Sequence, residues 1–262
     1  MQIGIIHDFI IAQRKSGRSD LITDLYPFAI ITVMKTFHAR ISELFSTSEG
    51  PGARIECSCA LLPAVGQYLL TQAEAVSSVL PVPLFPQAME GNELVVAPPV
   101  PREWYPGMEL SLRGPLGHGF HLPPSCRHLL LADLTRHHGQ RLLGLAQMRQ
   151  QPLETVLLSD IPPLDLPLQI EVLPLSAMRE ILAWADFIAV ELSLPQRNTL
   201  KALAGIQALA EFPTFAEALV DTPLPCAGIA RCGVCSVRVN HRWALACKDG
   251  PVFRLNALGE DQ

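Results

Sequence analysis

Four of the seven cysteines stand close together near the C-terminus, and their spacing constrains the fold more than any other feature of the sequence. They follow the pattern C-x5-C-x2-C-x11-C and are Cys226, Cys232, Cys235 and Cys247. Two cysteines separated by two residues direct both sulfurs at one metal centre, because the turn between them brings them together. Gly228 and Gly233 favour a tight turn with its N–H groups facing inward, where they stabilise thiolate and sulfide charge.

This spacing favours a [2Fe–2S] cluster with all four cysteines as ligands. A C-x4-C-x2-C run followed by a distant fourth cysteine is the plant-type [2Fe–2S] pattern, and the first gap here is one residue longer. A zinc site more often uses two short C-x2–4-C pairs, and disulfides need an oxidising compartment. Zinc and disulfides remain open alternatives.

The segment around these cysteines supports a resemblance to a known family. Residues 225–253 include CGVC, with a glycine between the last two cysteines of the loop, and the run ACKDGPVF at 246–253. They resemble the C-terminal cluster domain of the dihydroorotate dehydrogenase B electron-transfer subunit, which has four residues between its first two cysteines. The resemblance implies the same four ligands here.

Residues 53–120 predict a small antiparallel β-barrel, because short apolar runs alternate with proline and glycine. The phrases GQY at 66–68, WYPG at 104–107 and GPLGHGF at 114–120 resemble the flavin-binding barrel of ferredoxin–NAD(P) reductase-like proteins. The resemblance implies that Gly114, Pro115, Leu116 and Gly117 form a turn beside FAD. An ordinary turn between domains is the alternative, since glycine and proline suit any sharp turn.

The FAD site lacks one expected anchor. Barrels of that family carry an arginine, followed by an aromatic residue or proline and then serine, that pairs with the flavin pyrophosphate. Arginine suits this role because its planar fork binds phosphate through two hydrogen bonds. The corresponding residues 81–91 contain no arginine or lysine, which argues against FAD binding.

Residues 127–212 alternate between strands and helices. We predict strands at 127–133, 153–160, 168–173 and 186–192, and helices at 138–150, 175–185 and 195–212. Repeated strand–helix units indicate a parallel sheet of Rossmann-like type. The resemblance places a nicotinamide-binding domain here.

The chemistry of a dinucleotide site is missing from this region. The first strand runs into ADLTRHHG at 132–139, without a GxGxxG turn, and Asp133 would place a negative charge beside the phosphates. The family's later cysteine-glycine-proline turn is replaced by VELS at 190–193. We therefore expect no NAD(P) binding. The pair His137 and His138 is interpreted as a solvated loop pair, with a metal or proton-transfer role as the alternative.

The whole chain is predicted to be a multi-domain α+β protein. An amphipathic helix is predicted at residues 27–45, where apolar residues recur at helical spacing. The expected division is an N-terminal extension with this helix (1–52), a flavin-barrel-like domain (53–122), a nicotinamide-domain-like α/β domain (123–220) and a cluster domain (221–262). Cys57, Cys59 and Cys126 are interpreted as small buried hydrophobic residues.

Composition restricts the classes of partner that the chain is expected to bind. A formal charge of −5 argues against nucleic-acid binding. The sequence contains no run of 18 uncharged apolar residues, so we predict no membrane span. Docking on a membrane complex stays compatible with this, and a cytoplasmic location is expected. With 49% hydrophobic and only 17% charged residues, we expect surfaces covered by a protein partner.

These observations lead to one functional hypothesis and two alternatives. The first is an electron-transfer subunit that relays single electrons through a [2Fe–2S] cluster to a protein partner carrying another redox centre. It has no catalytic residue and no NAD(P)H site of its own. The alternatives are an FAD-containing reductase subunit of the dihydroorotate dehydrogenase B type and a non-redox subunit with a zinc-stapled C-terminal loop.

Overall fold

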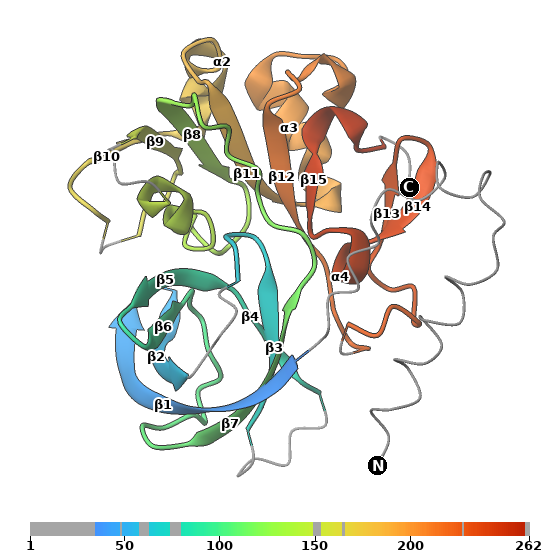
Figure 1. Cartoon of the computed structure of the whole chain (residues 1–262). Coiled ribbons are helices and arrows are strands. Elements are labelled where there is room, and N and C mark those ends of the chain that lie inside the picture. The colour runs from blue at the N-terminus through green and yellow to red at the C-terminus, as the bar shows by residue number, and fades with distance from the viewer. Residues whose placement is uncertain are drawn as a thin grey trace, which may run out of the picture. The chain divides into compact units, whose positions relative to one another are not determined.

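The computed structural model describes residues 35–47, 49–57, 63–73, 80–148, 153–163, 166–226 and 228–259, whose strands form two large sheets and a hairpin (Figure 1). Cysteines 57 and 126 are buried as predicted, whereas Cys59 lies outside the described residues. No helix in this part of the chain is long and apolar enough to cross a membrane.

The first sheet has seven antiparallel strands in the order β4-β3-β7-β1-β2-β6-β5. The strands are β1 (Lys35–Thr47), β2 (Gly50–Cys57), β3 (Tyr68–Ala73), β4 (Val82–Leu84), β5 (Pro86–Glu90), β6 (Glu93–Val96) and β7 (Glu109–Leu116). β4 and β5 stand at opposite ends of this order, yet only Phe85 separates them. The sheet must therefore curl on itself, as the predicted barrel requires, around a core that includes Ile41, Ile55 and Leu110.

The helix predicted at residues 27–45 is wrong over residues 35–45, because this segment is β1, paired with both β2 and β7. Residues 27–34 lie outside the described residues. The register slips between Ile41 and Glu43, so a bulge inserts one extra residue into the alternation of buried and exposed positions. Phe37, Ile41 and Phe45 recur every four residues, a spacing that fits the two-residue period of a strand as well as the 3.6-residue period of a helix. The barrel sheet accordingly begins at Lys35, within the expected N-terminal extension.

The second sheet has the order β10-β9-β8-β11-β12-β15, parallel throughout except for β15. Its strands are β8 (His128–Asp133), β9 (Glu154–Leu158), β10 (Ile170–Leu173), β11 (Phe187–Ser193), β12 (Ala216–Asp221) and β15 (Val252–Arg254). The four predicted strands are confirmed, and so is the parallel sheet. β8 and β11 are nearly continuous buried runs, as expected for strands covered on both faces.

The predicted helices are present only in shortened form. Residues 138–150 contain turns and the 3-10 helix η1 (Leu143–Gln147). Residues 175–185 contain η2 (Leu175–Ala177) and α2 (Met178–Ile181), and residues 195–212 contain α3 (Arg197–Ala204) and η4 (Leu209–Glu211), preceded by η3 (Leu194–Gln196). Gly205 ends α3 in the left-handed conformation, which halts the longer helix expected there.

The C-terminal segment is continuous with the parallel sheet. It contains the hairpin β13 (Ser236–Val239) and β14 (Arg242–Leu245), then α4 (Ala246–Asp249), β15 and η5 (Leu255–Ala257). Figure 1 shows β15 beside β12, with which it pairs antiparallel. Cys235, Val237 and Cys247 belong to the same apolar core as the strands of the α/β sheet. The cysteine segment is therefore anchored on the α/β domain.

Candidate metal centre and the crevice of the parallel sheet

The four predicted ligands lie on the loop between β12 and β13 and on the short helix α4. Cys226 and Cys232 occupy irregular backbone, Cys235 directly precedes β13, and Cys247 is in α4. The β13–β14 hairpin returns the chain to its start, where Ala246 N–H donates to the Cys235 carbonyl at 2.9 Å. The hairpin therefore brings the third and fourth cysteines together although 11 residues separate them in sequence.

The first pair of thiols lies against backbone N–H groups. Burial opposes ionisation of Cys226, but the N–H of Arg231, the thiol of Cys232 and the N–H groups of Cys232 and Ala230 outweigh it and lower the pKa of Cys226 to about 6. Ala230 has a left-handed φ of 58°, which turns its N–H into the loop. This is the inward-facing backbone predicted from the sequence, and it favours the thiolate that a metal requires.

The second pair is more deeply buried. Cys235 and Cys247 are each 2% exposed. Burial, followed by the contact with the Cys235 thiol and the charge of Cys226, raises the pKa of Cys247 to about 12. The N–H of Ala230 acts in the opposite direction on Cys247, as it does on Cys226. The four thiols thus form two contacting pairs, Cys226 with Cys232 and Cys235 with Cys247, that share one backbone donor.

The pairs do not form a single tight group. Among the residues that the structure describes, no three or more histidine, cysteine or carboxylate side chains lie close enough to hold one metal ion. The Cys226–Cys232 pair also faces outward, because Cys232 is exposed and Cys226 is half-buried. The arrangement has one edge at the surface and one edge in the core.

The barrel contributes one residue that contacts this centre, and sequence reasoning missed its role. Tyr68 of β3 is fully buried, and its hydroxyl donates to the backbone carbonyl of Cys247 at 2.9 Å. Burial and the nearby Cys247, Cys235 and Cys226 raise the pKa of the Tyr68 phenol, so it stays a neutral donor. A buried tyrosine needs a hydrogen-bond partner for its hydroxyl, and this requirement was the signal that could have indicated the contact.

Gly228 fits closely between the cysteine loop and the barrel. Its φ is +67°, and a Cβ there would lie 3.1 Å from Leu70 Cδ1, 3.2 Å from Tyr68 Oη and 3.3 Å from Leu116 Cδ1. The loop backbone therefore rests directly on β3 and β7, where a side chain would strain the left-handed backbone and force its neighbours to shift.

The predicted flavin turn lies close to the C-terminal segment. Gly114, Pro115 and Leu116 end β7, and the carbonyl of Gly117 accepts a hydrogen bond from Gln67 Nε2 at 2.9 Å. A Cβ on Gly117 would lie 2.3 Å from the Gly250 carbonyl oxygen. One side of the turn is thus packed against residue 250, two residues after Lys248 of α4.

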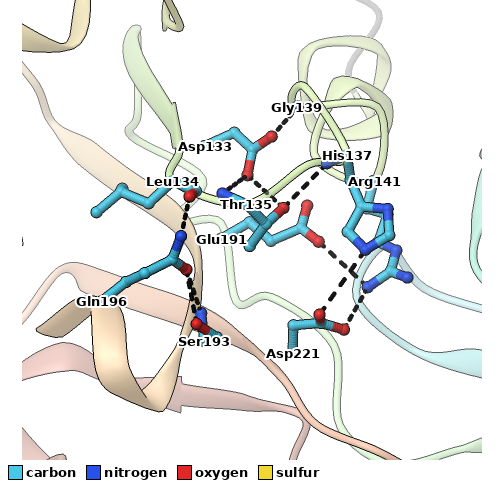
Figure 2. Close-up of polar contacts among 10 residues, drawn as sticks. All are labelled: Asp133, Leu134, Thr135, His137, Gly139, Arg141, Glu191, Ser193, Gln196 and Asp221. Carbon is cyan, nitrogen blue, oxygen red and sulfur yellow. Dashed lines mark hydrogen bonds and ion pairs between the residues drawn. The ribbon is translucent and has the colours of Figure 1, made fainter. Parts of the chain in front are cut away.

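A second polar site lies where the parallel strands end (Figure 2). β9 lies on one side of β8 and β11 on the other, and such a reversal opens a crevice at the carboxyl ends of the strands, where dinucleotides bind in related sheets. Asp133, Glu191 and Asp221 come from the ends of β8, β11 and β12. Three carboxylates therefore stand at this position.

The loop after β8 uses its backbone donors internally. Asp133 accepts hydrogen bonds from the N–H of Thr135, the hydroxyl of Thr135 and the N–H of Gly139, each at 2.7 Å. The N–H of His137 donates to the Thr135 hydroxyl at 3.1 Å. In a dinucleotide site these N–H groups would face the pyrophosphate.

Arg141 links the other carboxylates. Its guanidinium donates to Glu191 Oε1 at 3.2 Å and to Asp221 Oδ1 at 3.0 Å (Figure 2), and it lies 4.2 Å from the centroid of the Phe85 ring. Burial raises the pKa of the fully buried Glu191 to about 8 despite Arg141. The contact with His137, 3.8 Å away, and then Arg141 hold the pKa of Asp221 below its usual range.

This network corrects one expectation and adds residues that the sequence analysis missed. His137 is buried and paired with Asp221, so the interpretation as a solvated residue is wrong for it. Arg141 and Asp221 were not identified. The available signal was Glu191, a charged residue inside an apolar strand run, because a buried charge requires a partner.

Comparison with solved structures defines the class of fold. The chain is similar to an NADH-dependent reduced ferredoxin-NADP oxidoreductase, with 17% identity, a TM-score of 0.64, and coverage of 84% of this chain and 89% of that one. It is also similar to phthalate dioxygenase reductase, with 9% identity, a TM-score of 0.52, and coverage of 78% and 86%. Ferredoxin-NADP+ reductase from Plasmodium falciparum matches at 8% identity and a TM-score of 0.51, covering 71% and 96%. The fold is ferredoxin-reductase-like.

The cysteine segment matches a more specific domain model. Residues 226–259 match the model of the iron-sulfur cluster binding domain of dihydroorotate dehydrogenase B. No curated protein sequence matches the chain. Together the fold and the domain match confirm the resemblance stated from the sequence, and they support electron transfer through an iron–sulfur domain in a ferredoxin-reductase-like protein.

Proposed function

We propose that this chain is a subunit that relays single electrons through a [2Fe–2S] cluster within a larger oxidoreductase complex. The proposed ligands are Cys226, Cys232, Cys235 and Cys247. The observation that carries the proposal is the division of these thiols into two contacting pairs within a matched iron–sulfur domain. In plant-type clusters one pair of cysteines binds each iron, so two pairs suit two iron atoms better than a single zinc ion.

Residues of this chain prepare the site for such a cluster. A bound cluster would supply a reversible one-electron acceptor. The N–H of Ala230 and its neighbours stabilises thiolate charge, and Tyr68 fixes the carbonyl of Cys247 from the barrel side. The exposed Cys232 places one edge of the centre at the surface, where electrons can pass to a partner.

We further propose that the chain has no NAD(P)H site. The N–H donors of the loop after β8 already bind Asp133 and Thr135, which leaves them unavailable to a pyrophosphate. Asp133 and Asp221 stand at the place where phosphates would bind, whereas the raised pKa of the buried Glu191 keeps that carboxyl protonated near neutral pH.

The flavin position is also altered. Residues 81–91 contain no arginine or lysine that could pair with a flavin pyrophosphate. The chain's own residues cover this strand: Arg141 stacks on Phe85, and Gln87 Nε2 donates to Gln140 Oε1. A Cβ on Gly144 would lie 2.6 Å from the Gln87 carbonyl oxygen. A cavity of about 360 Å³ remains beside Pro86, Gln87 and Gly144, so the proposal of a relay without FAD rests on the missing basic residue.

The alternative of an FAD-containing reductase subunit draws on the flavin-based electron bifurcation of the NADH-dependent reduced ferredoxin-NADP oxidoreductase and on the Gly114–Gly117 turn. Anaerobic purification followed by iron, sulfide, zinc and flavin analysis distinguishes the functions. About two irons and two sulfides per chain without flavin is expected for the relay. Stoichiometric FAD would establish the reductase, and zinc without iron would establish the structural subunit.

A further inference from the structure

Exposed apolar side chains gather on the segment that carries the cysteines. Ile229 is 56% exposed and stands between the first two cysteines, while Val234 is 54% exposed and stands between the next two. Trp243, on β14, is 67% exposed. Leaving large apolar side chains in water is unfavourable, so their presence beside a surface-facing metal centre indicates a surface that becomes covered.

The same segment is basic although the chain is acidic. Residues 226–250 contain four basic residues and one acidic residue, a formal charge of +3, whereas the chain carries −5. The basic residues are Arg231, Arg238, Arg242 and Lys248. The one acidic residue, Asp249, accepts a hydrogen bond from the N–H of Leu245 at 2.9 Å. Charge is therefore distributed unevenly, with the positive part around the cysteines.

None of these four cations takes part in an ion pair among the described residues. Arg231, Arg242 and Lys248 are also exposed. Arg231 directly precedes the exposed Cys232, so a free cation stands beside the accessible edge of the centre. A complementary carboxylate has to come from elsewhere.

We propose that residues 226–248 form the docking surface for a redox protein that presents an acidic face around its own electron carrier. This inference rests on the proposed relay function. The apolar residues Ile229 and Val234 would exclude water over Cys232, while Arg231, Arg242 and Lys248 steer the acidic partner. Residues 1–34 contain three basic and three acidic residues, so they offer no net charge to complement this surface.

The test measures the rate at which the dithionite-reduced chain passes one electron to two protein probes of opposite charge. Acidic plastocyanin is the probe of the proposed partner type, and basic cytochrome c is its counterpart. In stopped-flow experiments the rate constant with plastocyanin should fall as ionic strength rises. The triple variant Arg231→Glu, Arg242→Glu, Lys248→Glu should lower this rate at least about tenfold at low salt and raise the rate with cytochrome c.

A matched control carries the same charge change elsewhere. The variant Arg102→Glu, Arg127→Glu, Arg254→Glu replaces three exposed cations outside the docking surface. Equal effects of the two triple variants would show that only net charge matters and would overturn the proposal. So would a change in cluster potential with unaltered rates, because the cations would then serve the cluster alone.

The apolar contribution is tested in the same way. The double variant Ile229→Ser, Val234→Ser should weaken saturation with plastocyanin at least about fivefold, while Ile161→Ser, Leu168→Ser, also exposed, should leave it unchanged. If the variant Ile229→Ser, Val234→Ser dissociates a homodimer, the surface binds a second copy of the chain. If removal of residues 1–34 speeds electron transfer, the surface binds the chain's own N-terminus. Either result overturns the proposal. Absence of a [2Fe–2S] signal in the wild type would instead refute the relay itself.

Discussion

Replacing Glu191 by glutamine should remove a pH dependence of stability that the wild type shows near neutrality. Glu191 is fully buried at the end of β11, and burial raises its pKa from the ordinary 4.5 to about 8. Between these values the folded chain holds a proton that the unfolded chain has lost. Stability therefore falls as pH rises from 4.5 to 8, because the unfolded state is favoured by deprotonation.

The magnitude follows from the two pKa values. At about 1.4 kcal/mol per pH unit, a rise from 4.5 to about 8 corresponds to roughly 5 kcal/mol, of which roughly 3–4 kcal/mol lies between pH 5 and 8. Glutamine has the same shape, accepts from Arg141 and does not ionise. The depressed pKa of Asp221 acts in the opposite direction, since its stabilisation is lost only as pH falls through the acid range.

The assay is urea unfolding at pH values from 5.0 to 8.5, with the free energy of unfolding extrapolated to zero urea. The Glu191→Gln variant should gain stability relative to wild type by a few kcal/mol across this range. Glu171→Gln, an exposed carboxylate on β10, is the matched control and should follow the wild type. Parallel pH profiles for wild type and Glu191→Gln would refute the reasoning.

Three further variants test the metal centre. Gly228→Ala should lower iron content and destabilise the chain by about 1–3 kcal/mol, because its Cβ meets the barrel, whereas Gly91→Ala, with a similar φ of +66° in open space, should cost only about 1 kcal/mol; iron analysis and urea unfolding measure both. Tyr68→Phe loses a hydrogen bond to the cysteine in α4, so it should destabilise the chain by about 1–2 kcal/mol and shift the cluster potential in a redox titration while iron is retained. Cys235→Ser should abolish stoichiometric iron, whereas Cys126→Ser, equally buried, should keep it in the same assay; loss from both would indicate general unfolding.

The sequence predicted the features that depend on local pattern. The parallel strands were predicted from continuous apolar runs such as those of β8 and β11. Strands buried on both faces show such runs, so they can be recognised without knowing which strands they pair with. The cysteines were found because metal ligation imposes short spacings. The absence of a glycine-rich turn after β8 could be recognised because a dinucleotide site also requires glycines at short, fixed spacings.

Features that depend on contacts distant in sequence were not predictable in this way. The four-residue spacing of Phe37, Ile41 and Phe45 fits either a helix or a strand, and only the pairing of this segment with β2 and β7 identifies it as a strand. Tyr68 meets Cys247 across 179 residues. Arg141 reaches Asp221 across 80 residues. No local signal connects such pairs, although the buried charge of Glu191 indicated that one must exist.

The proposed cluster relay exchanges electrons with a protein partner and not with a nicotinamide. The most direct measurement is EPR spin quantification of the anaerobic protein after dithionite, NADH or NADPH. A relay without a nicotinamide site should give a rhombic [2Fe–2S] signal of about one spin per chain with dithionite and no signal with NADH or NADPH. A full signal with either nucleotide would contradict it, because the loop N–H groups that bind Asp133 would then have to bind the dinucleotide.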